Sequence, residues 1–233
     1  MRWSRGKSCY AIFRSKVKVV ILTGYTSGLG GAIHDCLVSM SLKYKFIFIA
    51  REGIHSVMNS MKIYLKSDFS NIEEVASLKI SSHLQDVHEV VFINNAGIVT
   101  PICPVNEIKS RDFLSAVAIN YTSPVLLINK LRKDVEKIKI INISSGAAYR
   151  PVSYWSTYCS TKSAIRMYFD VISLENGISV QHFDPGVVDT KMQKIIRKKS
   201  EKYDELKIFE EIKRNKMLKN PTHVAQEICE LIK

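Results

Sequence analysis

The chain has 233 residues, of which 46% are hydrophobic. This length supports one domain with a full core and argues against two ordinary domains. The five cysteines and six histidines are scattered without the spacing of metal ligands, so the sequence predicts a reduced protein with no structural metal site. No apolar run approaches the roughly 18 residues that a membrane span needs, and we expect no membrane-spanning helix.

The net charge of +12 is concentrated in two stretches. Residues 1–18 contain six Lys and Arg and no acid, and residues 191–219 contain eleven Lys and Arg against five Asp and Glu. The pattern is compatible with nucleic-acid binding. It is more typical of a solvated basic arm and a charged lid, because neither stretch interleaves aromatic side chains on a regular face. We therefore predict no nucleic-acid partner and no membrane partner.

The arm at residues 1–16 permits several interpretations. It contains Arg and Ser and lacks acids, as in a mitochondrial transit peptide, and it also suits a membrane-surface arm or an upstream extension from a misplaced start. The long apolar region of a secretory signal is missing. We predict a cytoplasmic protein, with a mitochondrial one as the alternative.

The hydrophobic pattern predicts six strands that alternate with helices. Strands are expected at residues 17–23, 45–50, 61–66, 90–93, 139–143 and 178–183. Helices are expected after the first strand and at residues 71–80, 107–133, 155–175 and 224–231. The helix at 107–133 is expected to be interrupted in character by Asn120 and Pro124. This alternation predicts an α/β fold, a doubly wound parallel (Rossmann) sheet of strand order 3-2-1-4-5-6, with the ligand crevice at the carboxyl ends of the strands. Residues 17–233 would form this single domain, with a lid at about 191–219.

A glycine-rich turn follows the first strand and opens a helix. Gly24, Gly28 and Gly30 there allow the backbone to approach a pyrophosphate, which the helix N-terminus also favours. The second strand ends at Ala50 and is followed by Arg51. An acid at this place would accept the ribose hydroxyls of NAD, whereas a small residue followed by arginine suits the 2′-phosphate of NADP. The alternative is that Arg51 merely faces water.

Polar residues follow the third and fourth strands. Asp68 either accepts the adenine amino group, caps the helix at 71–80, or does both. The run 94–97 (NNAG) combines amide and small side chains, which allow a ligand to pass close to the backbone. Asn120 lies in an apolar stretch and needs a buried partner. Its role is either a structural amide bond or the holding of a water behind Lys162.

The fifth strand leads to Ser145, and the next helix carries Tyr158 and Lys162. Residues four apart on a helix leave the same face, so the ammonium and the phenol come within reach of each other. We expect Lys162 to lower the pKa of Tyr158 from about 10 towards neutrality, which makes Tyr158 a usable acid or base. Ser145 can present its hydroxyl to the same substrate oxygen. The three residues predict carbonyl and alcohol chemistry.

Six features together make the chain resemble the short-chain dehydrogenase/reductase family over about residues 17–230. They are TGYTSGLG (23–30), NNAG (94–97), Asn120, Ser145, YCSTK (158–162) and PGVVDT (185–190). The resemblance implies that Tyr158 protonates a carbonyl oxygen that Ser145 orients. Lys162 would bind the nicotinamide ribose, and Asn120 would hold a proton-relay water.

The cofactor implied is NADP(H). The residues predicted to contact it follow the strands and open the helices: Gly24, Thr26, Ser27, Gly28, Leu29, Gly30, Arg51, Asp68, Asn95, Ala96, Gly97, Tyr158, Lys162, Pro185, Val188 and Thr190. The stretches ARE (50–52) and DPGVVDTKMQ (184–193) look most like the NADP-dependent benzil reductase and sepiapterin reductase branch. The resemblance thus implies an NADPH-dependent carbonyl reductase. The rival interpretation, an idle nucleotide-sensing protein, has no need of Ser145, Asn120, Tyr158 and Lys162 together.

Three features depart from the family pattern. Tyr25 replaces a small residue in the glycine turn, and its ring must flank or crowd the adenosine phosphate. Asp184 is an unusual acid at the nicotinamide end. The sequence leaves no residues after the last helix for the family's seventh strand. We therefore expect a homodimer through the helices at 107–133 and 155–175 rather than a tetramer.

Aromatic and aliphatic residues are expected to shape the substrate pocket. Some precede the tyrosine, and others lie in the lid: Pro151, Val152, Tyr154, Trp155, Met192, Ile195, Ile196, Tyr203, Leu206, Ile208, Phe209 and Met217. Such walls favour a small hydrophobic ketone, diketone, quinone or pterin side chain. The alternative is that each of these residues is an ordinary core contact.

Overall fold

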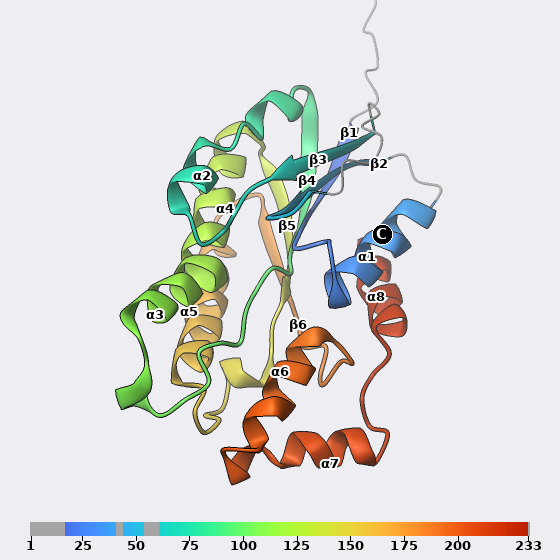
Figure 1. The fold of residues 1–233 in the computed structure, drawn as a ribbon. Helices are drawn as coiled ribbons and strands as arrows, with labels where there is room; N and C mark the ends of the chain where they lie inside the picture. Colours follow the sequence, from blue (N-terminus) through green and yellow to red (C-terminus); the bar gives the residue numbers. More distant parts are fainter. Residues whose placement is uncertain (1–16, 41–43, 54–60, 233) are drawn as a thin grey trace, which may run out of the picture.

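The computed structural model of the protein describes residues 17–40, 44–53 and 61–232. Within these ranges the chain forms one six-stranded parallel sheet of order β3-β2-β1-β4-β5-β6 (Figure 1). The strands are β1 (Val17–Thr23), β2 (Tyr44–Ala50), β3 (Lys62–Lys66), β4 (Val87–Asn94), β5 (Lys137–Ile143) and β6 (Ile178–Phe183). The predicted fold and strand order are confirmed. The described part of the chain contains no seventh strand in this sheet.

Helices cover both faces of the sheet (Figure 1). α1 (Gly28–Ser39) and α8 (Pro221–Glu230) pack on one face, and α4 (Ser123–Asp134) and α5 (Ser156–Ile172) pack on the other. Successive side chains of β1 alternate between the two layers, so that Val20 joins the α1 core while Ile21 joins the α5 core. Because both faces are buried, the central strands are continuous apolar runs instead of alternating ones.

The helix expected at 71–80 is shorter than predicted. α2 (Ile72–Ser77) is followed by a 3₁₀ turn at Ser81–His83. The side chain of Asn71 caps α2 by accepting hydrogen bonds from the backbone N–H groups of Glu73 and Glu74. The interpretation of Asp68 as the cap of this helix is therefore wrong.

The helix expected at 107–133 is divided into pieces. A 3₁₀ turn at Val105–Glu107 precedes α3 (Ser110–Val117), and a π-helical turn at Ala118–Thr122 joins α3 to α4. Wide turns of this kind are frequent at functional sites, because they re-aim the residues that they contain. Asn120 lies within this turn.

The chain after β6 forms α6 (Lys191–Ser200), a 3₁₀ turn at Asp204–Leu206, and α7 (Ile208–Arg214). These elements and the 3₁₀ turn at Gly146–Ala148 meet in a third, smaller core that includes Trp155, Tyr158 and Leu206. The helices predicted in this stretch are present, and its action as a lid stays a prediction. None of the helices in the described ranges is both long and apolar enough to cross a bilayer.

Candidate active site

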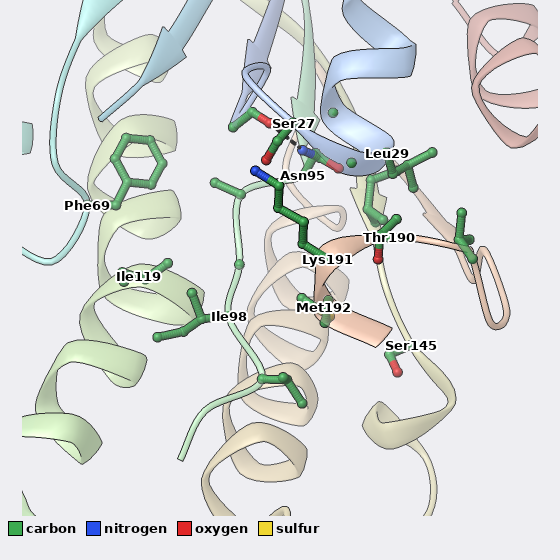
Figure 2. A pocket seen from close by; sticks show the side chains of 18 of the residues that line it. Ser27, Leu29, Phe69, Asn95, Ile98, Ile119, Ser145, Thr190, Lys191 and Met192 are labelled. Carbon is green, nitrogen blue, oxygen red and sulfur yellow. Dashed lines mark hydrogen bonds between the residues drawn. The ribbon is translucent and has the colours of Figure 1, made fainter. Parts of the chain in front are cut away.

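A cavity of about 630 Å³ lies at the carboxyl ends of the central strands. This volume is within the range of about 300–1,000 Å³ that is typical of small-molecule sites. All of the predicted site residues except Asn120 line it: Gly24, Thr26, Ser27, Gly28, Leu29, Gly30, Arg51, Asp68, Asn95, Ala96, Gly97, Ser145, Tyr158, Lys162, Pro185, Val188 and Thr190. Figure 2 shows Ser27 and Leu29 at the start of α1, with Thr190 and Met192 on the same cavity.

The glycine turn has the geometry expected of a phosphate cradle. Gly24 and Gly28 have φ values of +70° and +59°, a conformation that side chains with a Cβ disfavour. A Cβ on Gly30 would lie 2.0 Å from the carbonyl oxygen of Gly24, so only glycine fits there. Ser27 makes no side-chain capping hydrogen bond to α1. The first N–H groups of this helix are thus available to an anion.

A buried hydrogen-bond network holds the turn against the end of β4. The Asn95 Nδ2 donates to the carbonyl oxygens of Thr23 and Gly24, at 2.9 and 3.1 Å. The Thr23 Oγ1 accepts hydrogen bonds from the backbone N–H groups of Asn95 and Ala96. The amide of Asn95 therefore positions the glycine turn. The hydrogen bonds of Thr23, which is fully buried, were not predicted from the sequence.

Tyr25 neither flanks nor crowds the cavity. Its ring is 2% exposed and packs against His34, Phe48 and Tyr64 at centroid distances of 5.4, 5.6 and 5.5 Å. The burial of this aromatic surface turns the side chain into the core between α1 and the sheet. The two expected positions of Tyr25 are therefore wrong, and the space above the glycine turn stays open.

Arg51 and Asp68, the two charged residues predicted to contact the adenosine part of a cofactor, both line the cavity. Arg51 is largely exposed and lies 3.9 Å from a carboxylate oxygen of Glu52. The Asp68 carboxylate accepts hydrogen bonds from the backbone N–H and the hydroxyl of Ser70. Burial acts to raise the pKa of Asp68, but these hydrogen bonds and the charge of Arg51 outweigh it and lower that pKa.

Asn120 is buried behind the cavity, where its amide is fully engaged. The Oδ1 accepts a hydrogen bond from the Ile98 N–H, and the Nδ2 donates to the Ile98 carbonyl oxygen, both at 2.9 Å. The Nδ2 also donates to Thr161 Oγ1 at 3.1 Å. Of the two roles expected for Asn120, these contacts support the structural amide bond. The side chain connects the π-helical turn to the segment after β4 and to α5.

Ser145, Tyr158 and Lys162 come together at the other end of the cavity. Tyr158 and Lys162 are 6% and 7% exposed and leave the same side of α5. The Lys162 ammonium lies 5.9 Å from the Tyr158 ring centroid and donates a hydrogen bond of 2.8 Å to the Ile143 carbonyl oxygen. The Ser145 Oγ accepts a hydrogen bond from the Ala147 N–H. It also hydrogen-bonds with the Tyr158 hydroxyl, so the two hydroxyls meet at one point of the cavity wall.

The pKa of Tyr158 departs from its ordinary value in the direction opposite to our expectation. Burial raises the pKa of Tyr158 to about 12; the hydrogen bond with Ser145 lowers it, and the charge of Asp184 raises it further. Burial also lowers the pKa of Lys162 to about 8, although the charge of Asp184 opposes this change. Desolvation of both groups therefore dominates over their mutual attraction. Asp184 itself lies outside the cavity and accepts a hydrogen bond from the Gly186 N–H.

Lys191 also lines the cavity and was not among the residues predicted from the sequence. Figure 2 shows its side chain running from the start of α6 towards the glycine turn beside Ser27. Lys162 and Arg51 are the other cations on the cavity wall, and both already have a partner. In the described part of the chain, no carboxylate lies within 4 Å of the Lys191 ammonium. The sequence places Lys191 in the stretch DTKMQ (189–193). A role for it in the cavity could be inferred only once α6 was seen to start there.

The predicted substrate walls divide into two groups. Trp155, Met192, Ile195 and Ile196 line the cavity. Other members pack behind them, since Phe209 stacks on Trp155 and Tyr203 stacks on Tyr154. Further lining residues were not predicted, and half of them have apolar side chains: Ile49, Glu52, Ser67, Phe69, Ile98, Val99, Thr100, Ile119, Ile143, Ser144, Gly186 and Gln193.

Comparison with known proteins agrees with this site. The family model of the short chain dehydrogenases matches residues 18–201. Benzil reductase ((S)-benzoin forming) from Bacillus cereus is 32% identical over 93% of this chain and 94% of its own length. Sepiapterin reductase from Bos taurus is 26% identical over 91% of this chain and 88% of its own. The crystal structure of the KRED1-Pglu enzyme has a TM-score of 0.79 at 26% identity and covers 92% of this chain and 94% of its own. This chain therefore belongs to the short chain dehydrogenase family of oxidoreductases.

Proposed function

We propose that this chain is an NADPH-dependent reductase of small hydrophobic ketones, diketones, quinones or pterin side chains. The main support is that Ser145, Tyr158 and Lys162 lie on the same cavity as the glycine turn. Two relatives are named for the reduction of benzil and of sepiapterin, which supports a carbonyl substrate. The apolar wall formed by Trp155 and Ile196 favours a hydrophobic one.

The cavity fits a dinucleotide cofactor. The glycine turn and the uncapped start of α1 offer backbone N–H groups to a pyrophosphate, and Lys191 adds a positive charge beside them. The hydroxyls of Ser67 and Ser144, two lining residues, are buried and have no hydrogen-bond partner in the protein. A ligand that supplies partners would satisfy them. When bound, NADPH supplies the hydride for the reduction.

Arg51 supports NADPH over NADH. It follows β2 directly and lines the cavity, where its guanidinium can bind the 2′-phosphate through two parallel hydrogen bonds. The neighbouring Glu52 lies 3.9 Å from it, too far for a tight ion pair, and both side chains are largely exposed. The guanidinium is therefore free to exchange this contact for a phosphate.

Tyr158 supplies the proton, and Ser145 holds the substrate oxygen. With a pKa of about 12, the phenol is protonated at neutral pH. It can give its proton to the alkoxide that forms at the carbonyl. The Ser145 hydroxyl, which hydrogen-bonds with the Tyr158 hydroxyl, can donate to the same oxygen when a substrate is bound. Lys162 places a positive charge 5.9 Å from the phenol ring, which stabilises the phenolate left behind.

The proposal is tested by following NADPH oxidation against benzil, quinones and sepiapterin, with NADH as the cofactor control. We expect turnover with at least one of these carbonyl compounds and a preference for NADPH. Tyr158→Phe should abolish turnover, because it removes the proton donor, while NADPH binding measured by fluorescence changes by less than about twofold. Turnover that survives in Y158F would show that Tyr158 is not the donor, and an absence of NADPH binding in the unaltered protein would refute the proposed function.

We also propose a homodimer through α3, α4 and α5. Exposed apolar side chains gather near α3 and α5: Leu114, Met167, Val171 and Leu174 are 62%, 63%, 55% and 86% exposed. Apolar patches of this kind commonly mark interaction surfaces. Light scattering after size exclusion should give twice the mass of one chain. The substitution Val171→Glu should return the mass to that of a monomer.

A further inference from the structure

The basic stretch that stands out in the sequence forms a hollow between α6 and α7, away from the cofactor cavity. Arg197 and Lys198 on α6, and Lys213 and Arg214 on α7, line it together with two glutamates, Glu201 and Glu210. Figure 1 shows α6 and α7 next to each other at the lower end of the molecule, apart from the helices that cover the sheet. The reductase mechanism uses none of these side chains.

Three of the four cations have no partner of opposite charge. In the described part of the chain, no carboxylate oxygen comes within 4 Å of the charged nitrogens of Arg197, Lys198 or Lys213, while Arg214 lies 3.9 Å from Glu211. Among the two acids of the hollow, Glu210 accepts a hydrogen bond from the Ser200 hydroxyl. The hollow therefore has a positive balance that the protein itself does not neutralise.

One nitrogen of the Arg197 guanidinium group lacks a hydrogen-bond partner in the described part of the chain. Arg197 is half-buried, and this nitrogen, Nη1, is buried. A buried donor on a charged group is costly to leave unpaired, and guanidinium donors are nearly always matched by an acceptor. Its fork geometry suits the oxygens of a phosphate, to which it can donate two parallel hydrogen bonds.

We propose that the hollow between α6 and α7 binds a soluble anion that carries two or more phosphate charges. Arg197 anchors the anion from α6, and Lys213 and Arg214 close on it from α7. The anion would link the two helices that form the lid.

Calorimetric titration of the full chain with inorganic pyrophosphate tests the proposal. The titration is done at constant ionic strength and with one equivalent of NADPH, which occupies the cofactor cavity and leaves no surplus for the hollow. One site per chain is expected. Arg197→Gln should weaken the binding about tenfold or more, because it removes a bidentate, charge-assisted contact.

The variants are chosen so that a folding defect cannot imitate the result. Lys213→Gln/Arg214→Gln changes only exposed residues and should weaken binding to a similar degree. Lys194→Gln/Lys199→Gln removes the same number of charges from α6 outside the hollow, and should stay within about twofold of the unaltered protein.

Two outcomes would overturn the proposal. One is equal weakening in the hollow variants and in the control variants, which would show that only the overall charge of the segment matters. The other is binding to vesicles of phosphatidylcholine and phosphatidic acid without binding of pyrophosphate, which would identify the segment as a membrane-facing surface.

Discussion

Replacing Lys162 by methionine should change the pH dependence of stability in a defined direction. Burial lowers the pKa of Lys162 from 10.5 to about 8 in the folded protein. The unfolded chain therefore binds more protons than the folded chain between these two pH values, and the free energy of unfolding rises with pH across this window. Below about pH 8 both states carry the proton, and Lys162 contributes no slope.

The size of the effect follows from the difference between the two pKa values. A difference of about 2.5 units corresponds to about 3 kcal/mol, so the penalty for burying the charged Lys162 is about 3 kcal/mol at pH 7 and is mostly gone near pH 10. Methionine has a similar length and no charge. The variant loses the hydrogen bond to the Ile143 carbonyl oxygen, but that loss does not depend on pH.

Urea unfolding at pH values between about 7 and 10, without nucleotide, measures this effect. The difference in unfolding free energy, unaltered protein minus K162M, should become more positive by about 2–3 kcal/mol over this range. Tyr158 has the opposite dependence, since burial raises its pKa to about 12, but it is present in both proteins and its contribution cancels in the difference. Lys194→Met, on an exposed lysine of α6, is the control for losing a lysine. A difference that stays constant with pH would refute the assignment of Lys162 as a desolvated ammonium.

Three further substitutions test the cofactor end of the site. Lys191→Gln should raise the dissociation constant of NADPH about tenfold, because it removes the unpaired cation beside the glycine turn. NADPH fluorescence measures this constant, and Lys194→Gln on the same helix should leave it unchanged. Arg51→Gln should raise the KM for NADPH about tenfold and leave that for NADH nearly unchanged, and a parallel loss with both cofactors would contradict its assignment to the 2′-phosphate. Gly30→Ala should cost about 1–3 kcal/mol in urea unfolding and prevent NADPH binding, because its Cβ would lie 2.0 Å from a carbonyl oxygen of the turn. Gly31→Ala, whose Cβ would have no neighbour closer than 3.7 Å, should be tolerated.

The sheet and the line of site residues along its edge could be predicted because the physical signals are local. Each strand is an apolar run bounded by polar or small residues, and the carboxyl ends of parallel strands meet at one edge. The glycine turn after β1 and Ser145 after β5 are therefore brought together by topology alone. β4 begins at Val87 instead of residue 90, because its first residues are only partly buried and lack the apolar signal.

The direction of individual side chains could not be predicted in the same way. Tyr25 turns into the core because His34, Phe48 and Tyr64 leave an aromatic pocket for it, and these residues lie on α1, β2 and β3. The sequence indicates an interruption of the helix at Asn120, but the partners of its amide, Ile98 and Thr161, come from the segment after β4 and from α5. In both cases the outcome depends on packing between segments that are distant in the sequence.

The raised pKa of Tyr158 also depends on packing between distant segments, because burial is its main cause. The spacing of Tyr158 and Lys162 correctly places a cation near a phenol, but the spacing carries no information on solvent. In the folded protein both groups are desolvated, and the Lys162 ammonium donates to the Ile143 carbonyl oxygen rather than to the phenol. The phenol consequently stays protonated at neutral pH, as a donor must. In the proposed mechanism, desolvation keeps the proton on Tyr158 until it is transferred, and the nearby ammonium stabilises the charge only after the proton has left.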